Sequence, residues 1–149
     1  GASAATLTSL DVRGCARLTN ESFALVSQFR RLESLFIGKF CHDALGTRSL
    51  VCDADLGRLS QLSSLRFLDL VDDSCRITAD GFRHLTRLPR LAAIVLRTYK
   101  APSIFSGIDE LVGCSALEHA TFTGDVHVAS QTAELRSRRP FLRISVGDR

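Results

Sequence analysis

One pattern of apolar residues recurs along this 149-residue chain, and it constrains the fold more than any other feature. In residues 65–91, three leucines follow the spacing L-x-x-L-x-L of a short strand with one apolar side, and three apolar residues at three-residue intervals then predict a short helix with one buried stripe. The strand residues are Leu65, Leu68 and Leu70, and the helix residues are Phe82, Leu85 and Leu88. One strand and one helix in 26 residues form a repeat unit rather than a domain.

The same register extends over the whole chain. The units open at Leu7, Leu32, Leu65, Leu91, Leu117 and Phe141. Three residues further on lie Leu10, Leu35, Leu68, Ile94, Ala120 and Ile144, and five residues further on lie Val12, Ile37, Leu70, Leu96, Phe122 and Val146. Helix stripes are predicted at Phe23, Val26 and Phe29, at Leu56, Leu59 and Leu62, and at Ile108, Leu111 and Cys114. We therefore expect six strands, each backed by a helix or turn, in a single domain over residues 1–149.

The pattern resembles the leucine-rich repeat, and the resemblance covers residues 7–146. The 24–26-residue period, the pairs Leu18-Thr19 and Ile77-Thr78 before the helices, and Cys15 are similar to the cysteine-containing subclass found in F-box substrate receptors and in an ATP-synthase-associated factor. The resemblance implies an α/β solenoid of about five to six repeats, with a parallel sheet on the concave face, short helices on the convex face and a binding role. The column of Cys15 otherwise holds Phe40, Asp73, Tyr99 and Asp125, so the family's asparagine or cysteine ladder is mostly absent.

Composition agrees with an ordinary globular domain. The chain is 45% hydrophobic and 23% charged, and its net charge of +3 is too small to predict nucleic-acid or membrane binding by itself. No run of 18 apolar residues predicts a membrane span, and residues 1–6 do not resemble a signal peptide. Five cysteines without a disulfide-framework spacing favour a reduced, intracellular protein, cytoplasmic or mitochondrial, although Asn20-Glu21-Ser22 matches a glycosylation sequon. The chain contains no Met, which favours processing or excision from a longer chain.

Local signals add detail to this register. Thr19, Asp53 and Thr78 are predicted helix N-caps, and Pro102 suits a first helical turn. The fifth unit is weakly apolar, because its helix stripe reads Thr132, Leu135 and Arg138. Residues 1–6, ahead of the first strand, are too few to predict a folded cap. Terminal units of a solenoid need a cover, so we expect further chain or another subunit at its ends.

The second unit carries seven extra residues within 38–53, a loop whose role the sequence leaves open. Its Cys41, His42, Asp43 and Cys52 could suit zinc, but they lack a paired C-x-x-C spacing, so we predict neither a metal nor a cofactor.

Alternate strand residues predict which side chains face the concave surface. The predicted partner-binding site consists of Phe36, Phe67, Asp69, Val71, Val95, Arg97 and Arg13. An apolar centre with charged flanks is typical of a protein interface. The alternative is that these side chains contact only one another or a folded-back loop.

A second candidate surface is basic. Arg136, Arg138, Arg139 and Arg143 form a candidate RNA or phosphate contact, and further arginines gather at Arg30-Arg31 and at Arg83, Arg87 and Arg90. A solvated charged face is the favoured alternative, since no aromatic residues are interleaved for base stacking.

No hydrolase, zinc-protease or nucleotide-binding motif is present, so we predict a protein that is not an enzyme. The predicted function is a non-catalytic protein–protein interaction module or scaffold. Two alternatives remain, namely a structural subunit of a large RNA–protein or mitochondrial assembly, and the substrate-recognition part of a ubiquitin ligase. The sequence does not identify the partner.

Overall fold

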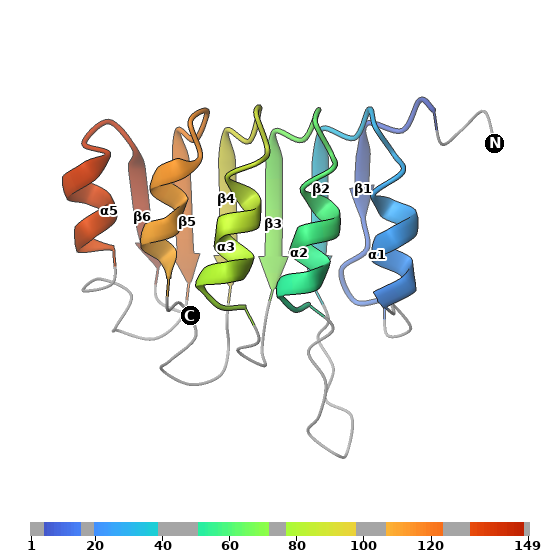
Figure 1. The fold of residues 1–149 in the computed structure, drawn as a ribbon, viewed down its shortest axis with the longest axis horizontal. Coiled ribbons are helices and arrows are strands. Elements are labelled where there is room, and N and C mark those ends of the chain that lie inside the picture. The colour runs from blue at the N-terminus through green and yellow to red at the C-terminus, as the bar shows by residue number, and fades with distance from the viewer. Residues whose placement is uncertain are drawn as a thin grey trace, which may run out of the picture.

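The computed structural model describes residues 5–15, 20–38, 51–71, 77–97, 107–123 and 132–147. Within these ranges the fold is α/β, with a single parallel sheet whose six strands follow one another in chain order (Figure 1). The strands are β1 (Ser9–Asp11), β2 (Ser34–Gly38), β3 (Phe67–Val71), β4 (Ala93–Arg97), β5 (His119–Thr123) and β6 (Arg143–Gly147).

A helix lies between each pair of successive strands in the chain, and all of the helices cover the same face of the sheet (Figure 1). They are α1 (Asn20–Val26), α2 (Asp53–Leu59), α3 (Ala79–Leu85), the 3₁₀ helix η1 (Ile108–Gly113) and α5 (Ala133–Arg138). We call the opposite face, which no described helix covers, the open face. None of the described helices is long and apolar enough to cross a bilayer.

The strand register is the one that the sequence predicts. Leu35, Leu68 and Ile94 are paired across β2, β3 and β4, and this row continues to Ala120 and Ile144. A second row runs Ile37, Leu70, Leu96, Phe122 and Val146. Residues at equivalent places in the repeat thus lie side by side. This register arises because each unit contributes one strand, and the strand begins the same number of residues after the opening residue in each unit.

The core lies between the sheet and the helices. Leu68 and Leu70 of β3 face the helix stripe of Phe82 and Leu85, and all four are at most 1% exposed. Each fully buried side chain of this size contributes about 1.5–3 kcal/mol. The predicted inward positions of the second to fifth units, from Leu32 to Phe122, are confirmed by burial wherever they are described.

The last unit departs from the prediction, because Phe141 is 97% exposed while Leu142 is buried. In three earlier units, those that open at Leu32, Leu65 and Leu117, the backbone N–H of the opening residue donates to the carbonyl oxygen three residues before it, as Leu117 does to Cys114 at 3.1 Å. In the last unit this turn joins Leu142 to Arg139 at 3.0 Å. The opening position therefore moves by one residue, and Phe141 points away from the core.

The ends of the sheet are less covered than its middle. Leu7, Leu10 and Val12 of the first unit and Ile144 of the last are only partly buried, and Val146 is 41% exposed. Each end strand has a neighbouring unit on one side only among the described residues, so its inward side chains are packed from one side.

Two helix caps show how neighbouring units are joined. Thr78 is the N-cap of α3, as predicted, and its hydroxyl accepts a hydrogen bond from the Asp80 N–H at 3.3 Å. Asp53 was predicted to cap α2, but Cys52 is the cap, in a reciprocal pair with Asp55. The Asp53 carboxylate instead accepts hydrogen bonds from the N–H and hydroxyl of Thr78, which links the starts of α2 and α3.

The cysteines divide between core and surface. Cys15 and Cys114 both occupy columns of the repeat, where a thiol is expected to pack as a small apolar group. Cys114 is completely buried, but Cys15 is exposed, so the expectation is wrong for Cys15. The predictions for Leu18, Thr19, Phe40, Asp73, Tyr99, Pro102 and Asp125 fall outside the described residues.

Candidate interaction surface on the open face of the sheet

Two phenylalanines lie at the middle of the open face. Phe36 of β2 and Phe67 of β3 are diagonal neighbours, since Phe36 is paired with Asp69 and Phe67 with Ser34. Their ring centroids are 5.1 Å apart with an interplanar angle of 44°, a favourable tilted arrangement, and both side chains are only partly buried. The pair is therefore a rigid aromatic surface that solvent still reaches.

A buried carboxylate lies beside this pair. Asp69 is 1% exposed, and its two oxygens accept hydrogen bonds from Nε and Nη2 of Arg97 at 3.1 and 3.0 Å. Nη1 of Arg13 lies 3.7 Å from Asp69 Oδ2 on the other side. A buried charge is tolerated where it is paired, and here two guanidinium groups from β4 and from the end of β1 neutralise it.

Arg13 joins the aromatic pair to the charged groups. Its guanidinium carbon lies 4.9 Å from the centroid of the Phe36 ring, within cation–π distance. It also donates to both carboxylate oxygens of Asp11, at 3.0 and 2.7 Å. These hydrogen bonds lower the pKa of the Asp11 carboxyl below its usual value and raise the pKa of Arg13.

The structure thus brings together five of the seven residues predicted for partner binding, namely Arg13, Phe36, Phe67, Asp69 and Arg97. Val95 is paired with Asp69 in β4 and is partly buried. Val71 was predicted to contact a partner, but it is only 4% exposed and offers almost no contact area. Asp69 is buried as well, so it supports the arginines from beneath instead of meeting a partner directly.

The four C-terminal arginines do not form one patch. Arg139 donates to the carbonyl oxygens of Val112 at 3.1 Å, Cys114 at 2.8 Å and Leu117 at 2.8 Å, so it ties the last unit to the one before it. Arg136 donates to the Ile144 carbonyl oxygen at 3.3 Å in the end strand β6. The sequence contains no signal for either structural role, because side-chain bonds to distant carbonyl groups have no spacing rule.

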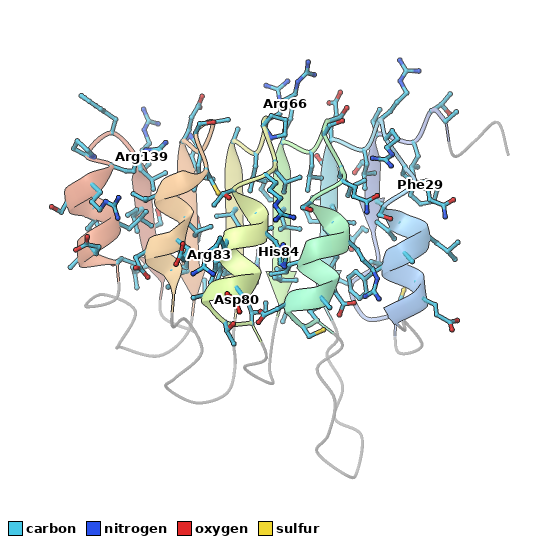
Figure 2. The ribbon with its side chains drawn as sticks, viewed as in Figure 1. Phe29, Arg66, Asp80, Arg83, His84 and Arg139 are labelled. Carbon is cyan, nitrogen blue, oxygen red and sulfur yellow. The ribbon has the colours of Figure 1, made fainter. Side chains whose placement is uncertain are left out.

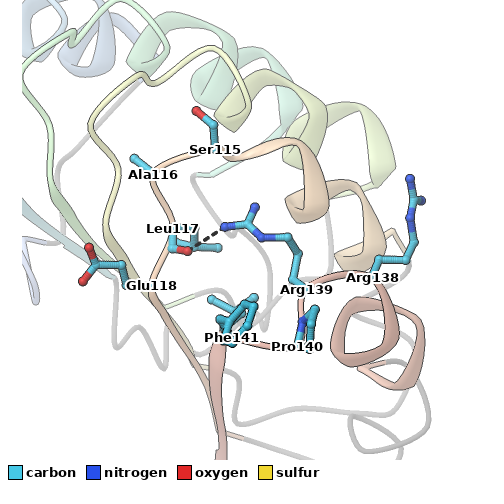
Figure 3. A pocket seen from close by; sticks show the side chains of 9 residues that line it. Ser115, Ala116, Leu117, Glu118, Arg138, Arg139, Pro140 and Phe141 are labelled. Atoms are coloured by element: carbon cyan, nitrogen blue, oxygen red, sulfur yellow. Dashed lines mark hydrogen bonds between the residues drawn. The ribbon is translucent and has the colours of Figure 1, made fainter.

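Arg138 and Arg143 remain exposed, Arg138 at the end of α5 and Arg143 at the start of β6. Arg138, Arg139 and Phe141 line a pocket of about 430 Å³ between two successive turns, together with Ser115, Ala116, Leu117, Glu118, Pro140 and Leu142. Figure 3 shows Arg139 reaching across it to the Leu117 carbonyl oxygen. The pocket therefore has an apolar wall beside both acidic and basic groups.

The described residues contain no group of three or more His, Cys, Asp or Glu side chains that could hold a metal. The loop residues considered for zinc, Cys41, His42 and Asp43, lie outside the described ranges. Comparison with protein-family models finds no match to this chain, and no curated protein matches it.

Proposed function

We propose that this chain is a leucine-rich-repeat solenoid that acts as a non-catalytic interaction module and binds a protein partner through the open face of its sheet. The observation that carries the proposal is the aromatic pair of Phe36 and Phe67 on the open face, which none of the described helices covers, flanked by the two arginines that hold Asp69. The strand-and-helix repeat supports the solenoid, and the composition of the surface supports the binding role.

The chemistry of this surface suits an interface centre. Aromatic residues and arginine are the residue types that most often dominate binding energy. Arg13 and Arg97 each keep 38% of their side-chain surface exposed, so they can still contact a partner at the rim of the aromatic pair. The two phenylalanine rings supply apolar area that loses water on association.

Rigidity supports the same proposal. Neighbouring strands fix the backbone beneath both rings, and the Asp69–Arg97 hydrogen bonds restrict a long side chain that would otherwise lose entropy on binding. Ordering a mobile side chain at an interface costs about 0.5–1.5 kcal/mol. A surface that is already ordered avoids most of this cost.

The test replaces one ring by a charge. Phe67→Glu places a carboxylate at the centre of the proposed interface, whereas Leu25→Glu makes the same kind of change at a 61% exposed position on α1, away from the open face. Native affinity purification with quantitative mass spectrometry should recover a partner with the wild-type chain and Leu25→Glu but not with Phe67→Glu. Circular dichroism should show all three chains folded.

Equal recovery of every co-purifying protein by the two folded variants would refute binding through the open face. Of the two alternative functions, a role in an RNA–protein assembly gains support from four exposed arginines, Arg31, Arg66, Arg87 and Arg90. A role in a ubiquitin ligase depends on the family resemblance alone.

A further inference from the structure

A second surface, separate from the open face, lies at the edge of the sheet where the chain enters each strand. We call it the strand-entry edge and define it by the turns between each helix and the next strand, residues 27–33, 60–66, 86–92, 114–118 and 139–142. All of these residues are described. Figure 2 shows Arg66 and Arg139 at this upper edge, with Asp80 near the opposite end of α3.

The strand-entry edge concentrates positive charge. Its arginines are Arg30, Arg31, Arg66, Arg87, Arg90 and Arg139, and its only acidic residues are Glu33 and Glu118. Six positive and two negative side chains give this edge a net charge of +4, whereas the whole chain has +3. The rest of the chain is therefore net −1, so the charge asymmetry is a property of this edge.

Four of these arginines are available to a ligand. Arg31, Arg66, Arg87 and Arg90 are exposed, and none forms an ion pair or side-chain hydrogen bond with another described residue. Some arginines elsewhere are paired, as Arg83 is with Glu110 at 2.7 Å and Arg58 with Asp55 at 2.9 Å, whereas Arg138 and Arg143 are exposed like those of the edge. An unpaired cluster of like charges repels itself unless an anion neutralises it.

The arginines come from successive units. Arg31 and Arg90 lie directly before the opening residues of the second and fourth units, and Arg66 lies directly after that of the third. They precede the successive strands β2, β3 and β4, and neighbouring strands are about 4.8 Å apart, so the set extends over about 10 Å at its backbone. The planar guanidinium group suits phosphate oxygens, which it can bind through two parallel hydrogen bonds.

An aromatic ring lies at the β6 end of the same edge. Phe141 is 97% exposed and forms one wall of the 430 Å³ pocket, next to Arg138 and Pro140 (Figure 3). The sequence predicted this ring to be buried, and its exposure supplies a fully accessible aromatic group, whereas Phe29 of the same edge is partly buried against the core. Proteins that bind single-stranded nucleic acids commonly stack bases on exposed aromatic rings.

We propose that the strand-entry edge binds a single-stranded nucleic acid, with phosphate groups on Arg31, Arg66, Arg87 and Arg90 and a base stacked on Phe141 beside the pocket. An acidic protein is the other polyanion to consider, but a protein interface needs an apolar centre. Phe141 is the only large exposed hydrophobic side chain among the residues of this edge, and it lies at one end of it. A charged chain with flat bases fits this arrangement better.

The test measures binding of a labelled single-stranded RNA oligonucleotide of mixed sequence by fluorescence anisotropy at several salt concentrations. Four phosphate contacts predict a slope of log K against log salt of about −3, and an affinity about 50-fold lower at about 200 mM salt than at about 50 mM. Arg66→Gln/Arg90→Gln should make the slope less steep by about 1.4, because two phosphate contacts are lost. The matched control Arg83→Gln/Arg136→Gln has the same charge change but should leave the slope unchanged.

A third variant tests the ring. Phe141→Ala should weaken RNA binding about tenfold without changing the salt slope, and Phe141→Tyr should restore it. Since Phe141 is exposed, neither change should lower the melting temperature measured by circular dichroism. Equal losses in the two arginine double variants would overturn the proposal, because they would show only an effect of net charge. Competition by polyglutamate as strong as that by RNA, with Phe141→Ala unchanged, would assign the edge to an acidic protein and overturn it as well.

Discussion

The buried carboxylate of the open face allows a quantitative prediction. Asp69→Asn keeps the shape of the side chain and removes its charge, while Arg97→Gln removes the partner that donates two hydrogen bonds to it. Both changes should destabilise the protein, and Arg97→Gln should cost more. It leaves a carboxylate that is 1% exposed with only the Arg13 guanidinium nearby, 3.7 Å away.

The magnitudes follow from burial and exposure. Removing one partner of a buried ion pair costs about 3–5 kcal/mol where the remaining charge is uncompensated. Arg13 still compensates Asp69 in part, so we expect about 3 kcal/mol for Arg97→Gln. In Asp69→Asn the charges that remain belong to Arg13 and Arg97, whose side chains are 38% exposed, so water can solvate them. The loss of stability should then be close to that of losing hydrogen bonds to a charged group, about 2 kcal/mol.

Urea denaturation followed by circular dichroism gives the free energy of unfolding, provided that the slope with denaturant is unchanged. The double variant Asp69→Asn/Arg97→Gln should cost less than the two single costs added together, with a coupling energy of about 1–2 kcal/mol. Arg83→Gln is the exposed control, and loss of its contacts with Glu110 should leave the free energy of unfolding nearly unchanged, because water solvates both groups. The reasoning would be refuted if both single variants at the open face unfolded within about 0.5 kcal/mol of the wild type.

Two further predictions concern packing and cysteine chemistry. Gly38→Ala should destabilise the protein by about 1–3 kcal/mol in thermal unfolding, because its new Cβ would lie 2.7 Å from Cβ and 2.8 Å from Cγ2 of Val71. In a Val71→Gly background, which lacks both atoms, Gly38→Ala should cost less, and an unchanged cost would show that the contact is not the cause. Burial raises the pKa of Cys114 to about 11. At about pH 8 its thiol should therefore react with iodoacetamide much more slowly than the exposed thiol of Cys15, as measured by peptide mass mapping. In denaturant the two thiols should react at equal rates. Equal rates in the native protein would contradict the burial of Cys114.

The strand register could be predicted because two periodicities agree. Within a unit, residues such as Leu68 and Leu70 alternate faces, and between units a fixed distance to the strand puts Leu35 beside Leu68. The prediction failed at Phe141, where Phe141 and Leu142 are both apolar and the opening position could be either. Only the turn hydrogen bond of the last unit decides between them.

The candidate site was predictable in position but not in contacts. Period-two alternation places Arg13, Asp69 and Arg97 on one face, but it cannot show that a single carboxylate is shared by two guanidinium groups. Side-chain hydrogen bonds between units, such as those of Asp53 and Arg139, depend on the length and rotamer of the side chain. They therefore produce no periodic pattern in the sequence. The exposure of Phe141 likewise follows from a local turn rather than from hydropathy.

The sequential strand order has a mechanical consequence. Each described strand pairs only with the strands of the units before and after it. The stability of a unit therefore depends on its contacts with its two neighbours. Opening should begin at β1 and β6, where a unit is held from one side among the described residues, and it should reach β3 last. The ion pairs of Arg13 and Arg97 with Asp69 connect the end of β1 to β3 and β3 to β4. They therefore stabilise the first four strands together and should slow unfolding from the N-terminal end.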